Sequence, residues 1–501
     1  MTRPWALVLV GAVLTVLAYP PFHLFVPSFI ALVPLYVLLD QAARDARPAR
    51  AGGYGLAAGL AANGALYWWM PIALRPYTAH SALAYGLAVV LLSLYWGLFS
   101  WWVVRTWIGL PRVPRWLVFA GGWTTMEWLF GHHGAIAFPW LGLGTSLTGF
   151  PAVVQWADVA GARGVTFWLA AANALVAVAL ISPVQYRRVA LAVIGSVFLA
   201  FGYGAIRSRS LGTHEAGRVL LVQSNEKLAV QRDTAEWSEA VAALADRTEG
   251  AVAALRPDLV LWPEAALQRG STEDLEVVQN VARRVNVPIV VGALEHIPGY
   301  GLSGPPYNSA VLIDPGSHLS GAVYRKRHLV PVAERGAIQP GADGVIMRLP
   351  TGTAAGVVIC YEVAFEGLAR AYRRRQADVL LNLSNDAWAG RTNARSQHTA
   401  HLVMRAIETR MGVARVANTG PSLVVDPLGR VTARTSSDVA TSLTAELATS
   451  TVTPWYVRMG DWVALAAGAV VLGLTGVLVL SSRRGRPDVR GESLPRGPAH
   501  R

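Results

Sequence analysis

The single cysteine of the chain, Cys360, stands where a nucleophile could be built. It follows residues 356–359, an apolar run typical of a buried strand, and precedes residues 363–375, whose apolar spacing predicts a helix. A thiol at such a strand-to-helix turn faces the free N–H groups and the positive dipole end of the helix, which favour the reactive thiolate. The alternative is a structural cysteine that packs as a small buried hydrophobe. A lone cysteine also excludes an internal disulfide and a multi-cysteine metal site.

Two other expected strand ends carry ionisable side chains. Glu264 follows the apolar run 259–262, and Lys326 closes the run 322–326. Taken singly, Glu264 could be a charge at a helix N-terminus, and Lys326 could be one member of a solvated basic run. Together with Cys360 they place a carboxylate, an ammonium group and a thiol at the ends of three strands.

These three residues lie in sequence words that resemble the nitrilase, or carbon–nitrogen hydrolase, superfamily. The words are W-P-E at 262–264, Y-x-K-x-H-L-V-P at 324–331 and C-Y-E at 360–362, in the family's order and with comparable spacing. The resemblance implies a catalytic triad of Glu264, Lys326 and Cys360. It also implies a four-layer α-β-β-α sandwich for residues 217–450.

The chemistry of the three residue types fits such a triad. Cys360 would attack a carbonyl carbon and hold the acyl group as a thioester, and Glu264 would take the thiol proton and later activate the second nucleophile. Lys326 would stabilise the tetrahedral oxyanion together with a backbone N–H after the cysteine.

The periodicity after residue 216 is that of an α/β domain, because short β-branched runs alternate with amphipathic helical stretches. Strands are expected at 218–223, 259–262, 288–294, 310–313, 322–326, 356–359, 379–382, 413–416 and 423–425. Helices are expected at 234–248, 272–285, 363–375 and 393–410.

The chain as a whole is too apolar for an ordinary soluble enzyme. The chain is 53% hydrophobic with a mean hydropathy of +0.37, and its apolar residues gather in blocks of membrane-spanning length. Eight spans are expected, at 5–22, 26–42, 52–74, 81–107, 115–131, 164–182, 188–206 and 459–481. A cleaved signal peptide is the alternative for the first, but no small-residue cleavage site follows it. The expected organisation is a transmembrane domain at 1–210, a catalytic domain at 217–450, a last helix at 459–481 and a disordered basic tail at 482–501.

The net charge of +13 could suggest a nucleic-acid binder, but the arginines follow a topology pattern. Clusters near residues 44–50, 105–115, 187–188 and 483–486 fall on one side of the membrane if the spans alternate. The positive-inside rule makes that side the cytoplasm and places both termini there, with the catalytic domain outside. The natural partner of the basic excess is then anionic lipid, and no nucleic-acid partner is expected.

A nitrilase-like domain joined to a polytopic membrane domain resembles the apolipoprotein N-acyltransferase family over essentially the whole chain. Weaker words in the membrane half, such as F-P-W-L at 138–141 and Q-W-A-D at 155–158, agree with the resemblance. It implies supporting roles for Glu334, Tyr361, Glu362, Asn385 and Trp388, and no cofactor or metal. The sequence departs from the family where Arg232, Val332 and Ala389 replace apolar or aromatic residues.

The resemblance implies a multi-pass enzyme of the bacterial plasma membrane that works on two lipid substrates. A phospholipid, typically phosphatidylethanolamine, would donate its sn-1 acyl chain to Cys360. The α-amine of a diacylglyceryl-cysteine at the N-terminus of an apolipoprotein would then accept the acyl chain as an amide. The alternative is a membrane-anchored amidase or nitrilase that uses the same triad with water as the second nucleophile.

Other residues invite a functional interpretation with less support. Glu127 lies within an expected span, where a carboxylate is usually functional or paired. His132 and His133 lack a third metal ligand nearby in the sequence. His398 and His401 could form a dyad with Cys360, although a place on a helix surface is favoured. Asp386 is expected to shape the pocket.

Overall fold

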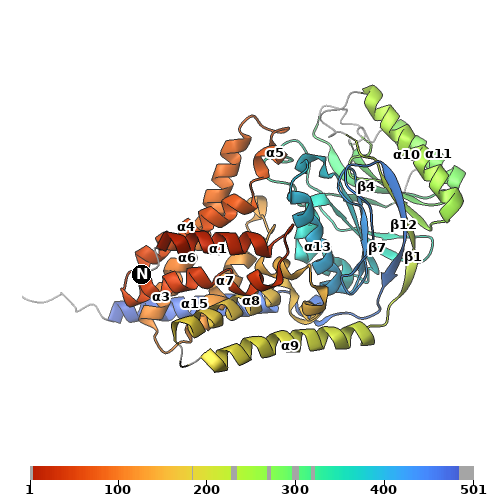
Figure 1. The fold of residues 1–501 in the computed structure, drawn as a ribbon. Coiled ribbons are helices and arrows are strands. Elements are labelled where there is room, and N and C mark those ends of the chain that lie inside the picture. Colours follow the sequence, from red (N-terminus) through yellow and green to blue (C-terminus); the bar gives the residue numbers. More distant parts are fainter. Residues whose placement is uncertain are drawn as a thin grey trace, which may run out of the picture.

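The computed structural model describes residues 4–182, 184, 186–226, 234–267, 272–295, 304–316 and 322–484. It consists of two parts that pack against each other (Figure 1). We call residues 4–210 together with the C-terminal helix the helical half, and residues 214–449 the sandwich half. Arg232 and most of the tail predicted at 482–501 lie outside the described residues.

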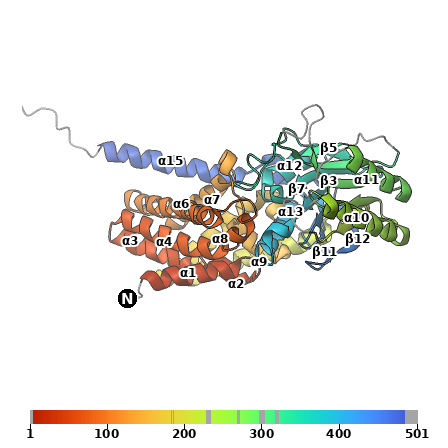
Figure 2. The same cartoon turned by 90° about the horizontal axis from the view of Figure 1, so that it is seen from above.

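The helical half is built from long apolar helices that lie side by side next to the sandwich half (Figures 1 and 2). Their bounds are α1 Pro4–Ala18, α2 Phe25–Ile30, α3 Val33–Arg44, α4 Pro48–Leu66, α5 Met70–Leu74, α6 Ser81–Gly109, α7 Arg115–Phe130, α8 Ala157–Ile181, α9 Tyr186–Ser210 and α15 Trp462–Arg484. Between α7 and α8 the chain forms the short 3-10 turns η1 Gly134–Ile136, η2 Leu143–Leu147 and η3 Pro151–Val153.

Every expected span coincides with a helix or a pair of helices, but their lengths differ. Five described segments are long and apolar enough to cross a membrane, at Phe25–Arg44, Ser81–Gly109, Ala157–Ile181, Tyr186–Ser210 and Trp462–Ser481. Helix α1 has 15 residues and α7 has 16. At 1.5 Å per residue each is shorter than a hydrocarbon core of about 30 Å. The count of eight spans therefore stays a prediction.

The outer surface of the helical half is apolar. Large hydrophobic side chains of α6, α9 and α15 are more than half exposed, among them Leu87, Leu98, Leu191, Phe198 and Leu472. A contiguous apolar exterior on long helices is the surface expected of a protein embedded in lipid, since lipid replaces the water that such side chains avoid.

The sandwich half contains two six-stranded sheets, in the orders β12-β1-β2-β3-β4-β5 and β11-β10-β9-β8-β7-β6. The strands are β1 His214–Gln223, β2 Leu259–Leu261, β3 Ile289–Glu295, β4 Tyr307–Ile313, β5 Val323–Arg325, β6 Ile346–Arg348, β7 Ala354–Ile359, β8 Val379–Ser384, β9 Gly412–Ala417, β10 Leu423–Val425, β11 Val431–Arg434 and β12 Thr441–Thr449. The central pairs β1–β2, β2–β3, β7–β8 and β8–β9 are parallel.

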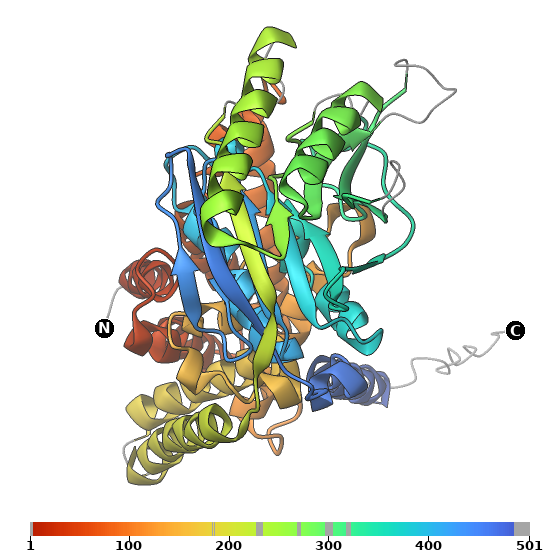
Figure 3. The ribbon, with the colours of Figure 1, turned by 90° about the vertical axis from the view of Figure 1, so that its right-hand side faces the viewer.

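Helices cover the outer face of each sheet, so the α-β-β-α fold class predicted from the sequence is confirmed. Helices α10 Thr234–Leu255 and α11 Thr272–Val285 lie outside the first sheet (Figure 3), and α12 Glu366–Arg374 and α13 Ala394–Thr409 lie on the second (Figure 2). Side chains of β1 alternate accordingly. Leu221 joins the core cluster that contains β7 and β8 residues, whereas Leu220 joins the cluster that contains α10 and α11 residues.

The predicted elements differ from the structure mainly at the edges of the sheets. Strands β6, β11 and β12 were not expected from the sequence, because they are short or only partly buried and lack a clear apolar alternation. The helix expected at 363–375 is divided into a 3-10 turn, η7 Cys360–Ala364, and the α-helix α12.

Candidate active site

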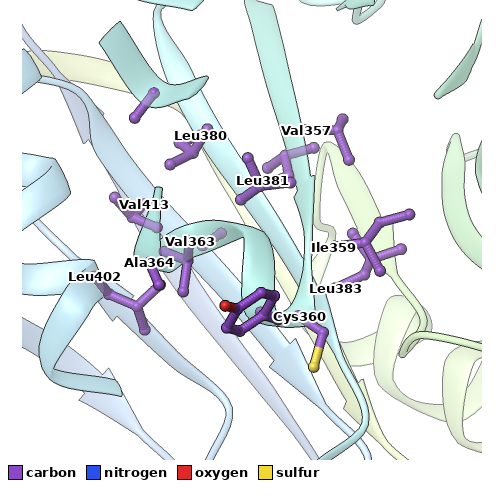
Figure 4. Close-up of a cluster of buried hydrophobic side chains, with 14 of the residues drawn as sticks. Val357, Ile359, Cys360, Val363, Ala364, Leu380, Leu381, Leu383, Leu402 and Val413 are labelled. Atoms are coloured by element: carbon purple, nitrogen blue, oxygen red, sulfur yellow. The ribbon is translucent and has the colours of Figure 1, made fainter. Parts of the chain in front are cut away.

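Cys360 lies on a sharp turn at the end of β7. Its φ angle is 50°, in the left-handed region that residues other than glycine seldom adopt, and its side chain is buried. Figure 4 shows the sulfur at the end of the strand, directed away from core side chains such as Leu380 and Leu381. Such backbone strain is found at sites where the surrounding structure holds a reactive group in place.

The ammonium group of Lys326 lies between two carboxylates. Its Nζ atom is 3.1 Å from Oε1 of Glu264 and 2.6 Å from Oε1 of Glu334, and the side chain is fully buried. Burial alone would lower the pKa of Lys326, but the two carboxylates raise it well above its ordinary value. Lys326 is therefore a fixed positive charge inside the site.

Glu264 is held by groups from both sheets. Its Oε1 accepts a hydrogen bond from Nδ2 of Asn308 at 2.7 Å, and its Oε2 accepts one from the backbone N–H of Asn385 at 2.8 Å. Asn308 lies on β4, and Asn385 follows β8. The carboxylate thus has a defined orientation, with one oxygen shared between Lys326 and Asn308.

The Cys360 side chain is a protonated thiol at neutral pH. Burial raises its pKa to about 12, and the Glu264 carboxylate adds to the effect while Lys326 opposes it. The expectation of a thiolate stabilised by a following helix is wrong, because a single 3-10 turn follows Cys360 in a fully buried site and α12 begins only at Glu366. The thiol therefore needs a base to take its proton when it reacts.

Glu362 joins the ends of two strands from different sheets. It is completely buried and accepts hydrogen bonds from the hydroxyl of Tyr324 and from the backbone N–H groups of Arg327, His328 and Ile359, at 2.7–3.0 Å. Burial opposes its ionisation, but the His328 side chain and the backbone N–H groups of Ile359 and His328 lower the pKa of Glu362 below its ordinary value. Glu362 thereby fixes the segment after Lys326 relative to Cys360.

The helical half forms one wall of the site. The Tyr361 hydroxyl donates to the carbonyl oxygen of Ala137 at 2.8 Å, and the Tyr361 ring stacks on Phe138 and Trp140 with centroid distances of 6.1 and 6.0 Å. Trp388 contacts Trp69 and Trp140 at 5.6 and 6.2 Å between ring centroids. The supporting residues predicted from the sequence thus lie around the triad. Glu334 contacts Lys326, Asn385 contacts Glu264, and Tyr361 and Glu362 directly follow Cys360. Trp388 packs on the aromatic residues of the helical half.

Tyr77 is a site residue that sequence reasoning missed. It lies between α5 and α6, and α5 packs on η8 Asp386–Ala389, the turn that follows the Glu264-binding Asn385. Burial and then the charges of Glu264, Glu334 and Cys360 raise the pKa of the Tyr77 hydroxyl, while the residue as a whole stays 37% exposed. No local sequence pattern predicts the position of Tyr77, because this position depends on the packing of α5 against η8, two segments that are far apart in the chain.

Both histidines of α13 are buried, so the predicted helix-surface position is wrong for His398 and His401. The helix is covered on its polar side by the helical half. His398 contacts the main chain of Cys360 and the side chain of Asp386, which is paired with Arg415. Among the described residues, no three His, Cys, Asp or Glu side chains are grouped as metal ligands.

Glu127 belongs to a buried ion-pair network between the two halves. Its carboxylate lies 3.3 Å from Nη1 of Arg163, whose Nε lies 2.8 Å from Glu366 of α12. Arg405 and Glu408 of α13 continue the network, and Glu408 accepts the backbone N–H of Ala162. Glu127 is thus a paired structural carboxylate.

Comparison with known proteins gives matches over both halves. Residues 218–457 match the carbon-nitrogen hydrolase family, and residues 11–175 match the apolipoprotein N-acyltransferase N-terminal domain. The apolipoprotein N-acyltransferase of Geobacter metallireducens is 30% identical over 94% of this chain and 95% of its own length. That of Bradyrhizobium diazoefficiens is 31% identical over 97% and 96%. Among solved structures, a mutant of an amidase from Nesterenkonia, described as from the nitrilase superfamily, aligns with a TM-score of 0.39 and 20% identity, over 50% of this chain and 95% of that one.

Proposed function

The chain belongs to the apolipoprotein N-acyltransferase family and is an acyltransferase, and we propose that it forms a thioester between Cys360 and an acyl chain taken from a phospholipid. The acceptor is the α-amine of the diacylglyceryl-cysteine at the N-terminus of an apolipoprotein. The observation that carries this proposal is the placement of Lys326 between Glu264 and Glu334, in the site that also contains the only cysteine.

In the first step, Glu264 takes the proton of the Cys360 thiol as the sulfur attacks the ester carbonyl of the phospholipid. Lys326 stabilises the negative charge that develops on the carbonyl oxygen. The carbon–oxygen bond to glycerol then breaks, and Glu264 returns the proton to the leaving alkoxide. The products are the thioester and a lysophospholipid, so atoms and charges balance.

In the second step, the α-amine of the lipoprotein attacks the thioester. Glu264 accepts a proton from the attacking nitrogen, a carbon–nitrogen bond forms, and the carbon–sulfur bond breaks. The departing sulfur regains a proton, and the thiol is restored. A thiol pKa of about 12 suits this cycle, because the resting cysteine is protected from adventitious electrophiles until Glu264 acts.

The membrane setting follows from the substrates. Both carry long acyl chains, and exposing them in an aqueous pocket would cost about 0.8 kcal/mol per CH₂ group. A site walled by Tyr361, Trp140 and Trp69 at the junction of the halves allows the chains to stay in apolar surroundings. A dry site also protects the thioester from water.

We place the protein in the bacterial plasma membrane with the sandwich half outside the cytoplasm. The arginine clusters near 44–50, 105–115, 187–188 and 483–486 support cytoplasmic termini. The proposed organisation remains a membrane domain at 1–210, the catalytic domain at 217–450 and a last span at 459–481.

Intact-protein mass spectrometry after incubation with phosphatidylethanolamine in detergent tests the proposal. Wild type should gain the mass of one fatty acyl group, hydroxylamine should remove it, and Cys360→Ala should gain none. A diacylated lipopeptide should discharge the adduct and appear as its N-acylated form. Lysophospholipid with free fatty acid and no N-acylated lipopeptide would overturn the proposal in favour of a hydrolase.

A further inference from the structure

His398 lies directly behind the nucleophile and contacts its main chain. The side chain projects from α13, is completely buried, and places Nε2 at 3.0 Å from the carbonyl oxygen of Cys360. This carbonyl belongs to the residue whose φ angle is 50°. A hydrogen bond at this point holds the strained turn in its observed conformation.

The neighbours of His398 fix which of its nitrogens carries the proton. Nη2 of Arg415 lies 3.3 Å from Nδ1 of His398, and a guanidinium can only donate. Oδ1 of Asp386 lies equally close to Nδ1, at 3.3 Å, and can only accept, so these two contacts oppose each other. The contact at the other nitrogen decides: the Cys360 carbonyl can only accept, so Nε2 of the ring carries the hydrogen donated to it. Arg415 is itself held by Asp386 at 2.6 Å and by Asn382 at 2.6 Å. Burial and the positive Arg415 lower the pKa of His398, so the ring is neutral.

The carbonyl of Cys360 and the N–H of Tyr361 belong to one planar peptide group. Fixing the oxygen therefore also fixes the direction of the N–H on the opposite side of that plane. Tyr361 is the second residue of the turn η7, and the first N–H groups of a helical turn have no acceptor within the turn. This N–H is free to meet an oxyanion on the carbon bonded to the Cys360 sulfur.

We propose that His398 is a positioning residue, which holds the Cys360 carbonyl so that the Tyr361 N–H points at the oxyanion in both acyl-transfer steps. The carbonyl oxygen of Cys360, the acceptor at Nε2, sets its tautomer, and Arg415 and Asp386 hold the other side of the ring. The proposal deepens the function proposed above and rests on it. It assigns His398 no proton transfer with the thiol, because both ring nitrogens are already engaged, one by the Cys360 carbonyl and the other by Arg415 and Asp386.

The test compares His398→Leu and His398→Gln in the full-length protein in detergent. A glutamine amide can donate to the same carbonyl, whereas leucine cannot. Acylation of Cys360 by phosphatidylethanolamine should fall about 10²–10³-fold in His398→Leu, the usual cost of an oxyanion donor, through kcat rather than KM. His398→Gln should recover a large part of the loss. His401→Gln is the matched control, because His401 is a buried histidine of the same helix that also contacts Trp140 but whose Nε2 has no hydrogen-bond partner among the described residues.

Alkylation of the thiol by iodoacetamide separates positioning from other roles, because displacement at a saturated carbon forms no oxyanion. His398→Leu should be alkylated at the wild-type rate and with the wild-type pH profile. A shifted pH profile would overturn the proposal in favour of a Cys–His dyad. Equal losses in alkylation and acylation would assign His398 to general support of the fold, and unchanged acylation would also overturn the proposal.

If His398→Leu does not fold, His398→Gln and His398→Asn are compared by the ratio of their acylation rate to their alkylation rate. The proposal requires this ratio to stay near the wild-type value in His398→Gln. In His398→Asn, whose amide has a shorter reach, the ratio should fall well below the wild-type value.

A p-nitrophenyl ester keeps this test independent of the lipid donor. It acylates Cys360 through the same kind of oxyanion, so the His398 variants should lose activity toward it as they do toward phospholipid. If wild type reacts with the ester but not with phospholipid, the proposed function is contradicted. The role of His398 is then tested by the rates at which its variants react with the ester.

Discussion

The hydroxyl of Tyr361 donates a 2.8 Å hydrogen bond to the carbonyl oxygen of Ala137, which connects the turn of the nucleophile directly to the helical half. Tyr361 follows Cys360 in the chain, whereas Ala137 lies between α7 and α8. The position of the reactive turn therefore depends on a segment more than 200 residues away. The helical half is part of the active site as well as a membrane anchor.

Tyr361→Phe tests this dependence. The substitution keeps the ring stacked on Phe138 and Trp140 but leaves the buried Ala137 carbonyl without its donor, a cost of about 1–3 kcal/mol. We expect a lower unfolding temperature and slower acylation. Tyr85→Phe is the control, because its hydroxyl also binds a backbone carbonyl, that of Gly64, but within the helical half. Wild-type acylation in Tyr361→Phe would contradict a positioning role for the helical half.

The pH dependence of Cys360 alkylation reports the charges around the thiol. Glu264 raises the pKa of Cys360 and Lys326 lowers it. Glu264→Gln should therefore shift the alkylation profile to lower pH, and Lys326→Met should shift it to higher pH, although both variants lose acylation. Glu334→Gln should leave the profile nearly unchanged, because Glu334 contacts Lys326 and not the thiol. Shifts of opposite sign would refute the arrangement of charges described here.

Glu362→Gln should destabilise the protein. A glutamine presents an NH₂ group where the carboxylate accepts several hydrogen bonds, so at least one donor loses its partner at a cost of about 1–3 kcal/mol. Because the pKa of Glu362 is lowered on folding, its contribution is complete above the ordinary glutamate pKa of about 4.3 and is lost as the pH falls through the lower folded value.

Unfolding of Glu362→Gln and wild type should be compared at neutral pH and in acid. The difference between their stabilities should be largest near neutrality and should shrink below about pH 4. A difference that is constant over this range would show that the charge of Glu362 is not the stabilising feature.

Breaking the ion pair between the halves should be costly. Glu366→Gln removes the bidentate partner of Arg163 at a buried position, where loss of one partner typically costs about 3–5 kcal/mol. Glu249→Gln breaks the exposed pair with Arg284 and should cost about 0–1 kcal/mol. Thermal unfolding in detergent measures both, and equal effects would contradict the importance of burial.

The triad could be found from the sequence because each member follows a strand. Glu264, Lys326 and Cys360 were expected at the ends of three strands, and in the structure they follow β2, β5 and β7. The family resemblance supplied the pairing of Glu264 and Cys360 with Lys326. The contacts of Glu362 with two strand ends, in contrast, have no counterpart in any local pattern.

Helix α13 shows why the rest of the site could not be predicted from the sequence. Its sequence alternates apolar residues with Gln, His and Arg, which predicts one buried and one solvated face. The structure buries both faces, since the helical half covers the polar one. Gln397 there accepts hydrogen bonds from the indole N–H groups of Trp69 and Trp140, at 2.9 Å each. Only the packing of two distant segments turns a polar face into an interface.

The ion pairs between the halves also bear on the order in which the chain is made. Arg163 and Asp158 of α8 leave the ribosome 203 and 252 residues before their partners Glu366 and Arg410, so the helical half is made while these partners do not yet exist. Each has a second partner nearby, since Glu127 pairs with Arg163, and Arg207 pairs with Asp158. Both charges of α8 thus have a partner within the helical half that does not depend on the sandwich half, which docks onto this bundle later.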